Sequence, residues 1–189
     1  MTESPEAAPI AAGNLPGDPS PEETVARILR VDHAGEYGAV RIYAGQLAVL
    51  GTTAMGGTIE KMAACEQEHL KAFSHMLAER RVRPTVLSPI WHVAGYALGV
   101  ATALMGPKAA MACTAAVEEV IDEHYAGQAA ALGDTEPALR ERIESFRADE
   151  IAHRDEALAQ GAEQAPAYFL LAGAIKVGSR LAIWLSTRL

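Results

Sequence analysis

Cysteine is scarce in this chain of 189 residues, which contains only Cys65 and Cys113. Two cysteines cannot form a disulfide framework, and their spacing resembles no zinc site, so we expect a reducing intracellular compartment. Aromatic residues number only ten, and β-branched residues are few. Alanine, the strongest helix former, supplies 38 residues. This composition favours an all-α fold over a β-sandwich or a barrel.

Positive charge is also in short supply, because 24 acidic residues outweigh 16 Lys and Arg and leave a net charge of −8. That balance argues against nucleic acid as a partner, since nucleic-acid-binding domains carry a basic face. Residues 1–21 contain no Lys or Arg and five prolines, which excludes a secretory signal and an Arg-rich transit peptide. We expect residues 1–21 to form a disordered tail and residues 22–189 to form one domain.

Long apolar runs are missing as well, because no stretch reaches about 18 uninterrupted apolar residues, and we expect no clean transmembrane span. The chain shows helical periodicity instead, with prolines and glycines at the predicted helix ends. The pattern predicts six helices, near residues 21–50, 58–82, 89–105, 107–132, 136–160 and 166–187. Two amphipathic helices followed by an apolar one occur twice, about 80 residues apart. This pseudo-twofold repeat indicates a four-helix bundle with two additional apolar helices outside it.

Each of the four amphipathic helices places a carboxylate in the middle of its apolar stripe, and two add a histidine three residues later. An isolated Glu-x-x-His is common by chance, but four unpaired buried carboxylates would cost many kcal/mol without a cation between them. No Lys or Arg falls on these stripes, so we expect metal ions there. Two single Glu and two Glu-x-x-His pairs form the ligand set of ferritin-like di-iron or di-manganese bundles. The predicted ligands are Glu36, Glu66, His69, Glu118, Glu150 and His153.

Oxygen donors with one imidazole per metal favour iron or manganese over zinc. A ligating histidine normally donates its other ring N–H to a carboxylate or a carbonyl. We expect Asp149 to reach His69 across the bundle, and Asp32 or Asp122 to serve His153. The alternative for each Asp is a solvated or helix-capping side chain.

Four segments of the chain form distinctive motifs. They read Val31-Asp-His-Ala-Gly-Glu36-Tyr-Gly-Ala, Glu66-Gln-Glu-His69-Leu-Lys-Ala-Phe, Ala112-Cys-Thr-Ala-Ala-Val-Glu118-Glu and Arg180-Leu-Ala-Ile-Trp-Leu-Ser-Thr-Arg-Leu. Over residues 24–189 the chain resembles the di-iron demethoxyubiquinone hydroxylases of ubiquinone biosynthesis. The family's iron ligands fall on the six residues that the spacing selects. His124 and Tyr125 match a His-Tyr pair that the family places near metal and quinone, which implies a role in substrate binding or electron transfer.

The resemblance implies O₂-dependent hydroxylation of one unsubstituted ring carbon in a demethoxylated quinol with a polyprenyl tail. The cofactors that it implies are two iron ions, with NADH or a reductase as the source of two electrons per turnover. The chain has no G-x-G-x-x-G motif, so we expect no built-in nucleotide-binding domain. The connection near Gly133 is shorter than in eukaryotic members, which indicates a bacterial protein.

The two apolar helices indicate where such a substrate would enter. The segments near 89–105 and 166–187 each carry one Trp, and residues 80–117 contain no Asp or Glu. We expect peripheral attachment to the cytoplasmic side of a bacterial cell membrane through these helices, on anionic lipid. The alternative is packing on the bundle or on a second copy in a homo-oligomer. An accessory lipid-binding protein, which the family often uses, would contact the same helices.

Two other functions account for part of these features. A rubrerythrin-like peroxidase or ferroxidase would use the six ligands but not the apolar helices. A non-enzymatic helical binding module would use the buried carboxylates to hold structural metal. A hydroxylated quinone that forms only with iron and O₂ separates the hydroxylase from both.

Overall fold

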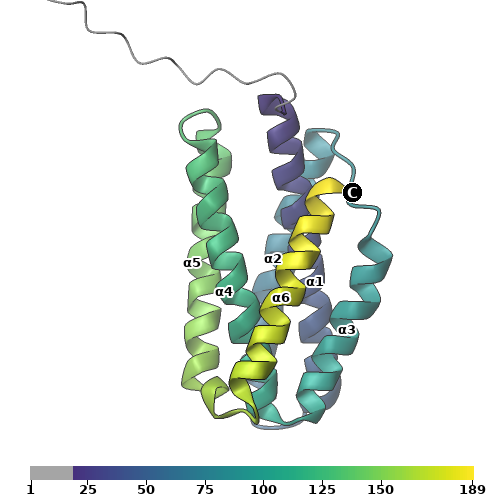
Figure 1. Ribbon diagram of the computed structural model, residues 1–189, viewed down its shortest axis with the longest axis vertical. Helices are drawn as coiled ribbons and strands as arrows, with labels where there is room; N and C mark the ends of the chain where they lie inside the picture. Colours follow the sequence, from purple (N-terminus) through teal and green to yellow (C-terminus); the bar gives the residue numbers. More distant parts are fainter. Residues whose placement is uncertain (1–18) are drawn as a thin grey trace, which may run out of the picture.

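The computed structural model describes residues 19–189, and these residues form helices and connections without any strand (Figure 1). The tail predicted for residues 1–21 therefore lies outside the described residues, except for residues 19–21. The all-α prediction is confirmed. The elements are α1 (Pro21–Leu50), α2 (Gly56–Glu79), α3 (Ser88–Leu104), α4 (Pro107–Leu132), α5 (Pro137–Ala159), the 3₁₀ turn η1 (Ala162–Gln164) and α6 (Tyr168–Arg188).

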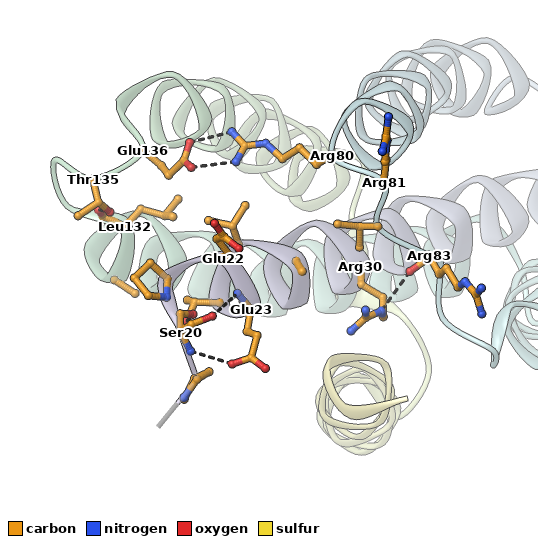
Figure 2. Close-up of a pocket in the computed structure, with 17 residues that line it drawn as sticks. Ser20, Glu22, Glu23, Arg30, Arg80, Arg81, Arg83, Leu132, Thr135 and Glu136 are labelled. Carbon is orange, nitrogen blue, oxygen red and sulfur yellow. Dashed lines mark hydrogen bonds and ion pairs between the residues drawn. The ribbon is translucent and has the colours of Figure 1, made fainter. Parts of the chain in front are cut away.

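Local sequence signals set most of the helix starts. At α1, the Glu23 N–H donates to Ser20 Oγ at 3.1 Å, and the Ser20 N–H donates to Glu23 Oε2 at 2.8 Å, which completes a capping box (Figure 2). Proline occupies the first turn of α1, α3, α4 and α5, where its missing N–H leaves no hydrogen bond unmade. The same end of the molecule is fastened by an ion pair from Arg80 to Glu136, at 2.7 Å.

The helix boundaries differ from the predicted ones by at most three residues, and two of these differences have a clear local cause. Helix α2 ends at Glu79 and not near residue 82, because Arg81 adopts a left-handed conformation with φ 54°. The Val82 N–H then donates back to the Leu77 carbonyl at 2.9 Å, which closes the helix end. Helix α6 begins at Tyr168, because the η1 turn and a left-handed Ala167 precede it.

The bundle consists of α1, α2, α4 and α5, while α3 and α6 lie together on one side of it, with α3 on α1 and α6 on α4 (Figure 1). At the α1–α3 contact, backbone atoms of the two helices approach each other closely. A Cβ atom at Gly99 would lie 2.0 Å from the Ile42 carbonyl oxygen, and one at Gly45 would lie 2.3 Å from the Tyr96 carbonyl oxygen. Glycine is therefore required at both positions if the two helices are to approach this closely.

Helix α6 is tied to the bundle by its charged residues. Lys176 pairs with Glu119 at 2.5 Å and Arg180 pairs with Glu123 at 2.8 Å, both on α4. The rest of its surface is strongly apolar, and Phe169 is 90% exposed. Judged by length and composition alone, with a mean hydropathy of 1.4, α6 is long and apolar enough to cross a membrane.

The buried apolar residues form two clusters, which leave the middle of the bundle to polar side chains. On α1, for example, Leu29 belongs to one cluster and Tyr43 to the other. On α2 the corresponding residues are Phe73 and Ile59. Between these positions the buried polar residues are carboxylates and a histidine. The packing thus concentrates buried charge at the middle level of all four bundle helices.

Candidate metal centre

The structure brings all six predicted ligands together at this middle level. Helices α1 and α4 contribute one residue each, and α2 and α5 contribute two residues that lie three positions apart on the inward face. The four glutamates and His69 are buried, and only the side chain of His153 is 12% exposed. The contributors are Glu36 on α1, Glu66 and His69 on α2, Glu118 on α4, and Glu150 and His153 on α5.

The six side chains form two overlapping groups of four, in each of which the donor atoms lie within 4.8 Å of one another. One group contains Glu36 and His69 and the other contains Glu118 and His153, while Glu66 and Glu150 belong to both. His69 Nδ1 lies 3.1 Å from Glu150 Oε1, and His153 Nδ1 lies 2.9 Å from Glu66 Oε1. Each histidine therefore faces a carboxylate of the opposite helix, as a pseudo-twofold centre requires.

Unpaired polar atoms in this cluster match what a pair of metal ions needs. Every one of the six residues has at least one buried oxygen or nitrogen without a hydrogen-bond partner among the described residues, and for Glu66 and Glu150 both carboxylate oxygens are in this state. Leaving one such atom unsatisfied costs about 1–3 kcal/mol. No described Lys or Arg pairs with the four carboxylates. Hard oxygen donors with one imidazole per group fit two divalent ions such as iron or manganese.

Electrostatics within the cluster lead to the same conclusion. Burial raises the pKa of Glu36, Glu66 and Glu118, the last two well above the usual range for a carboxyl group. Burial also opposes the charge on Glu150, but the neighbouring histidines His153 and His69 hold its pKa at about 2. Without a cation, the cluster therefore limits its charge by keeping protons on carboxyl groups, and bound metal ions would take the place of those protons.

Two buried tyrosines hold the outer carboxylates in a reciprocal arrangement. The Tyr43 hydroxyl of α1 donates to Glu118 Oε1 of α4 at 2.9 Å. The Tyr125 hydroxyl of α4 donates to Glu36 Oε1 of α1. Each tyrosine lies seven residues after the glutamate of its own helix and fixes the glutamate of the other. The sequence motifs indicated a role for Tyr125 only, although Tyr43 occupies the equivalent position in the repeat.

The polar residues around the cluster were predicted in part. Asp149 Oδ2 lies 3.2 Å from His69 Nε2, which confirms the expected contact across the bundle. The expectation that Asp32 or Asp122 serves His153 is wrong. Asp32 accepts a hydrogen bond from Gln128 at 2.7 Å and lies 3.3 Å from His124, which places all three one helical turn away from the cluster.

Asp122 lies on the outer side of α4, where it pairs with two arginines of α5. Its carboxylate accepts from Arg147 at 2.6 Å and from Arg154 at 3.2 Å. Helical periodicity predicts which face of its helix a residue lies on, but not which residue of the neighbouring helix lies opposite it. The sequence alone therefore could not show that Asp149 contacts a histidine of the cluster while Asp32 and Asp122 do not.

An apolar cleft of about 520 Å³ runs between α1, α3, α4 and α6, close to the cluster. Gly35 and Val117, which line it, are the immediate neighbours of Glu36 and Glu118. Trp91 closes one side, and its indole N–H donates to Ser186 Oγ at 2.9 Å. A larger cavity of about 960 Å³ at the end of the bundle is lined by charged residues and by none of the six (Figure 2). The apolar cleft is likewise lined by none of the six, but its lining includes immediate neighbours of Glu36 and Glu118, so it is the opening that adjoins the cluster.

Comparison with known proteins agrees with this geometry. The family described as "Ubiquinone biosynthesis protein COQ7" matches residues 23–186. The chain belongs to this family. Among its relatives, a 3-demethoxyubiquinol 3-hydroxylase of Rhodospirillum rubrum is 58% identical over 179 residues, which cover 94% of this chain and 84% of the relative.

Eukaryotic members of the COQ7 family are similar over the same region. The human NADPH-dependent 3-demethoxyubiquinone 3-hydroxylase, a mitochondrial protein, is 53% identical over 87% of this chain and 78% of its own length. The mitochondrial 5-demethoxyubiquinone hydroxylase of Saccharomyces cerevisiae is 38% identical over 86% of this chain and 77% of its own length. The resemblance found in the sequence motifs is thereby confirmed, and the high identity to a bacterial relative fits a bacterial protein.

Proposed function

We propose that this protein hydroxylates a demethoxylated polyprenyl quinol with O₂, in ubiquinone biosynthesis, at a centre of two iron ions. The observation that carries the proposal is the cluster of six buried donors beside an apolar cleft. The names of the relatives, all hydroxylases of demethoxyubiquinone or its quinol, support the choice of substrate.

In this proposal Glu66 and Glu150 would be able to bind either ion, because each belongs to both donor groups. Glu36 and His69 complete one site, and Glu118 and His153 complete the other. The iron pair, when bound, activates O₂ for insertion of one oxygen atom into the ring. The two tyrosine hydroxyls keep the outer carboxylates oriented, and Asp149 keeps His69 in the tautomer that presents Nδ1 to the centre.

The apolar cleft is the proposed binding site for the quinone. Its lining is almost entirely aliphatic and glycine, with Trp91 as the one aromatic residue, which suits a hydrophobic ring with an isoprenoid tail and excludes water from the centre. Tyr125 is the more direct of the two predicted substrate residues, since it touches Glu36, while His124 acts one turn away through Asp32.

Reducing equivalents come from outside the chain in this proposal. The mammalian relatives carry NADPH-dependence in their names, which supports a reduced nicotinamide nucleotide as the electron donor. Because the chain has no G-x-G-x-x-G motif, the nucleotide would act through a reductase or through the bound quinone.

Peripheral attachment to the cytoplasmic side of a bacterial cell membrane completes the proposal. The exposed apolar side chains of α3 and α6, such as Val93, Phe169 and Trp184, face solvent on the side that holds the cleft. Ion pairs with α4 hold Lys176 and Arg180 on the bundle, which favours a helix that lies on the bilayer over one that spans it. An accessory lipid-binding protein or a second copy of the chain would cover the same surface.

The test is a reaction of iron-loaded protein with reductant, ¹⁸O₂ and a short-chain demethoxyquinone, followed by mass spectrometry of the quinone. We expect one labelled oxygen atom in the product, and no product after Glu118→Gln. Glu119→Gln is the matched control, because Glu119 pairs with Lys176 outside the cluster. Rapid oxidation of iron or consumption of peroxide without labelled quinone would favour a rubrerythrin-like ferroxidase or peroxidase instead.

A further inference from the structure

A second set of metal-binding side chains lies directly outside the centre, around the other nitrogen of His69. Cys65 and His69 are four residues apart and share one face of α2, and Asp149 reaches them from α5. Cys65 Sγ lies 3.5 Å from His69 Nε2, and Asp149 Oδ2 lies 3.2 Å from the same nitrogen. The three donor atoms all lie within 4.8 Å of one another.

These spacings are those of a tetrahedral zinc site before the ion enters. With a Zn–S bond of about 2.3 Å and Zn–N and Zn–O bonds of about 2.1 Å, tetrahedral geometry separates sulfur from nitrogen by about 3.6 Å and nitrogen from oxygen by about 3.4 Å. The observed distances of 3.5 and 3.2 Å agree with both values. Little movement would be needed to bind an ion.

The chemistry of the three donors differs from that of the inner cluster. Thiolate sulfur is a soft ligand and selects zinc-like ions, whereas the carboxylate-rich centre prefers iron or manganese. The site is also reachable, because the Asp149 side chain is 50% exposed and Cys65 is only partly buried. Solvent on that side can supply the fourth ligand of a tetrahedral ion.

We propose that Cys65, His69 Nε2 and Asp149 bind one thiophilic divalent ion of the zinc class, at a site separate from the two-metal centre. The ion binds the thiolate form of Cys65 and releases the thiol proton to solvent. The ion also replaces the Nε2 proton that Asp149 otherwise accepts. One imidazole ring then joins this ion to the inner centre, which makes the centre sensitive to thiophilic metals.

Cadmium is the probe, because its bond to thiolate produces an ultraviolet charge-transfer band that oxygen and nitrogen ligands do not produce. In iron-loaded protein kept reduced and anaerobic, we expect one equivalent of Cd²⁺ per chain to produce this band. Cys65→Ser should abolish it. Asp149→Asn should keep the thiolate and the band but require at least about tenfold more Cd²⁺. Cys113→Ser is the matched control, because Cys113 is fully buried on α4, and it should leave the titration unchanged.

A band that is absent from the unaltered protein, or that survives in Cys65→Ser, would overturn the proposal, as would loss of the band in Cys113→Ser. Circular dichroism checks that each variant is folded. Protection of Cys65 from alkylation by one equivalent of Cd²⁺ gives the same answer on the unaltered chain. Hydroxylation is not measured at any step, so failure of the proposed function leaves this result intact, and the reverse also holds.

Discussion

A Glu118→Gln substitution removes one negative donor from the buried cluster and leaves the shape of the side chain almost unchanged. The glutamine carbonyl can still accept the hydrogen bond that Tyr43 donates to this position at 2.9 Å. Burial raises the pKa of Glu118 well above its usual range, so it favours the protonated carboxyl group, of which glutamine is a neutral analogue. Metal-free stability should therefore change by less than about 1 kcal/mol.

The effect should appear when metal is added. An ion that binds only the folded state stabilises it by about 2.7 kcal/mol at a free concentration of roughly 100 times its Kd. For a chain of this size each kcal/mol raises the melting temperature by about 2–4 °C, so each ion should add roughly 5–11 °C. Glu118 belongs to only one of the two donor groups, so the variant should lose the increment of one ion and keep that of the other.

Thermal melts followed by circular dichroism, with and without Mn²⁺ as a redox-stable ion, measure both quantities. Glu119→Gln should show the full metal-induced rise, because that residue pairs with Lys176 on the surface of the bundle. The reasoning is refuted if Glu118→Gln keeps the full rise, or if Glu119→Gln loses it to the same extent.

Three further predictions test other parts of the structure. Asp149→Asn should weaken binding of metal at the centre by about 10–100-fold, measured by calorimetric titration, and unchanged affinity would exclude its supporting role. Arg80 lowers the pKa of the Glu136 carboxyl group from its ordinary value of 4.5. The half-exposed ion pair therefore contributes about 0.5 kcal/mol to the free energy of unfolding above pH 4.5, and this contribution is lost as the carboxyl group is protonated in acid. Urea unfolding should therefore distinguish Glu136→Gln from the unaltered protein at neutral pH and not well below pH 4.5. Gly99→Ala should lower the free energy of unfolding by about 3 kcal/mol, because the added Cβ would meet backbone atoms of α1. Gly173→Ala, whose Cβ would meet nothing within 4 Å, should instead stabilise α6 by about 0.5–1 kcal/mol. Equal effects of the two substitutions would contradict the close contact between α1 and α3.

The sequence predicted the six inward-facing residues of the cluster because two independent regularities agree there. Helical periodicity assigns Glu36 and Glu66 to apolar faces, and burial of a charge on such a face needs a chemical reason. The repeat then pairs Glu66 with Glu150 across the two halves of the chain. Prolines marked the starts of α3, α4 and α5 for an equally local reason, since the ring is tolerated only in the first turn.

What the sequence could not predict depends on how the helices meet. The neighbour of Asp32 is His124, on a different helix and 92 positions away, and no local pattern encodes that height. The same is true of Cys65, whose approach to Asp149 appears only once α2 and α5 are in contact. The early end of α2 depends on a left-handed Arg81, a conformation that sequence rules reserve for glycine or asparagine.

The backbone contact between α1 and α3 determines which wall of the apolar cleft can adapt to its contents. At Gly45 and Gly99, which lie against carbonyl oxygens of the facing helix, no side chain separates these two helices that could compress or rearrange. Helix α6, by contrast, has most of its surface in solvent and is fastened to α4 through flexible Lys176 and Arg180 side chains. In the proposed binding mode, a quinone tail of variable length would be accommodated by displacement of α6, while the wall formed by α1 and α3 would keep its dimensions.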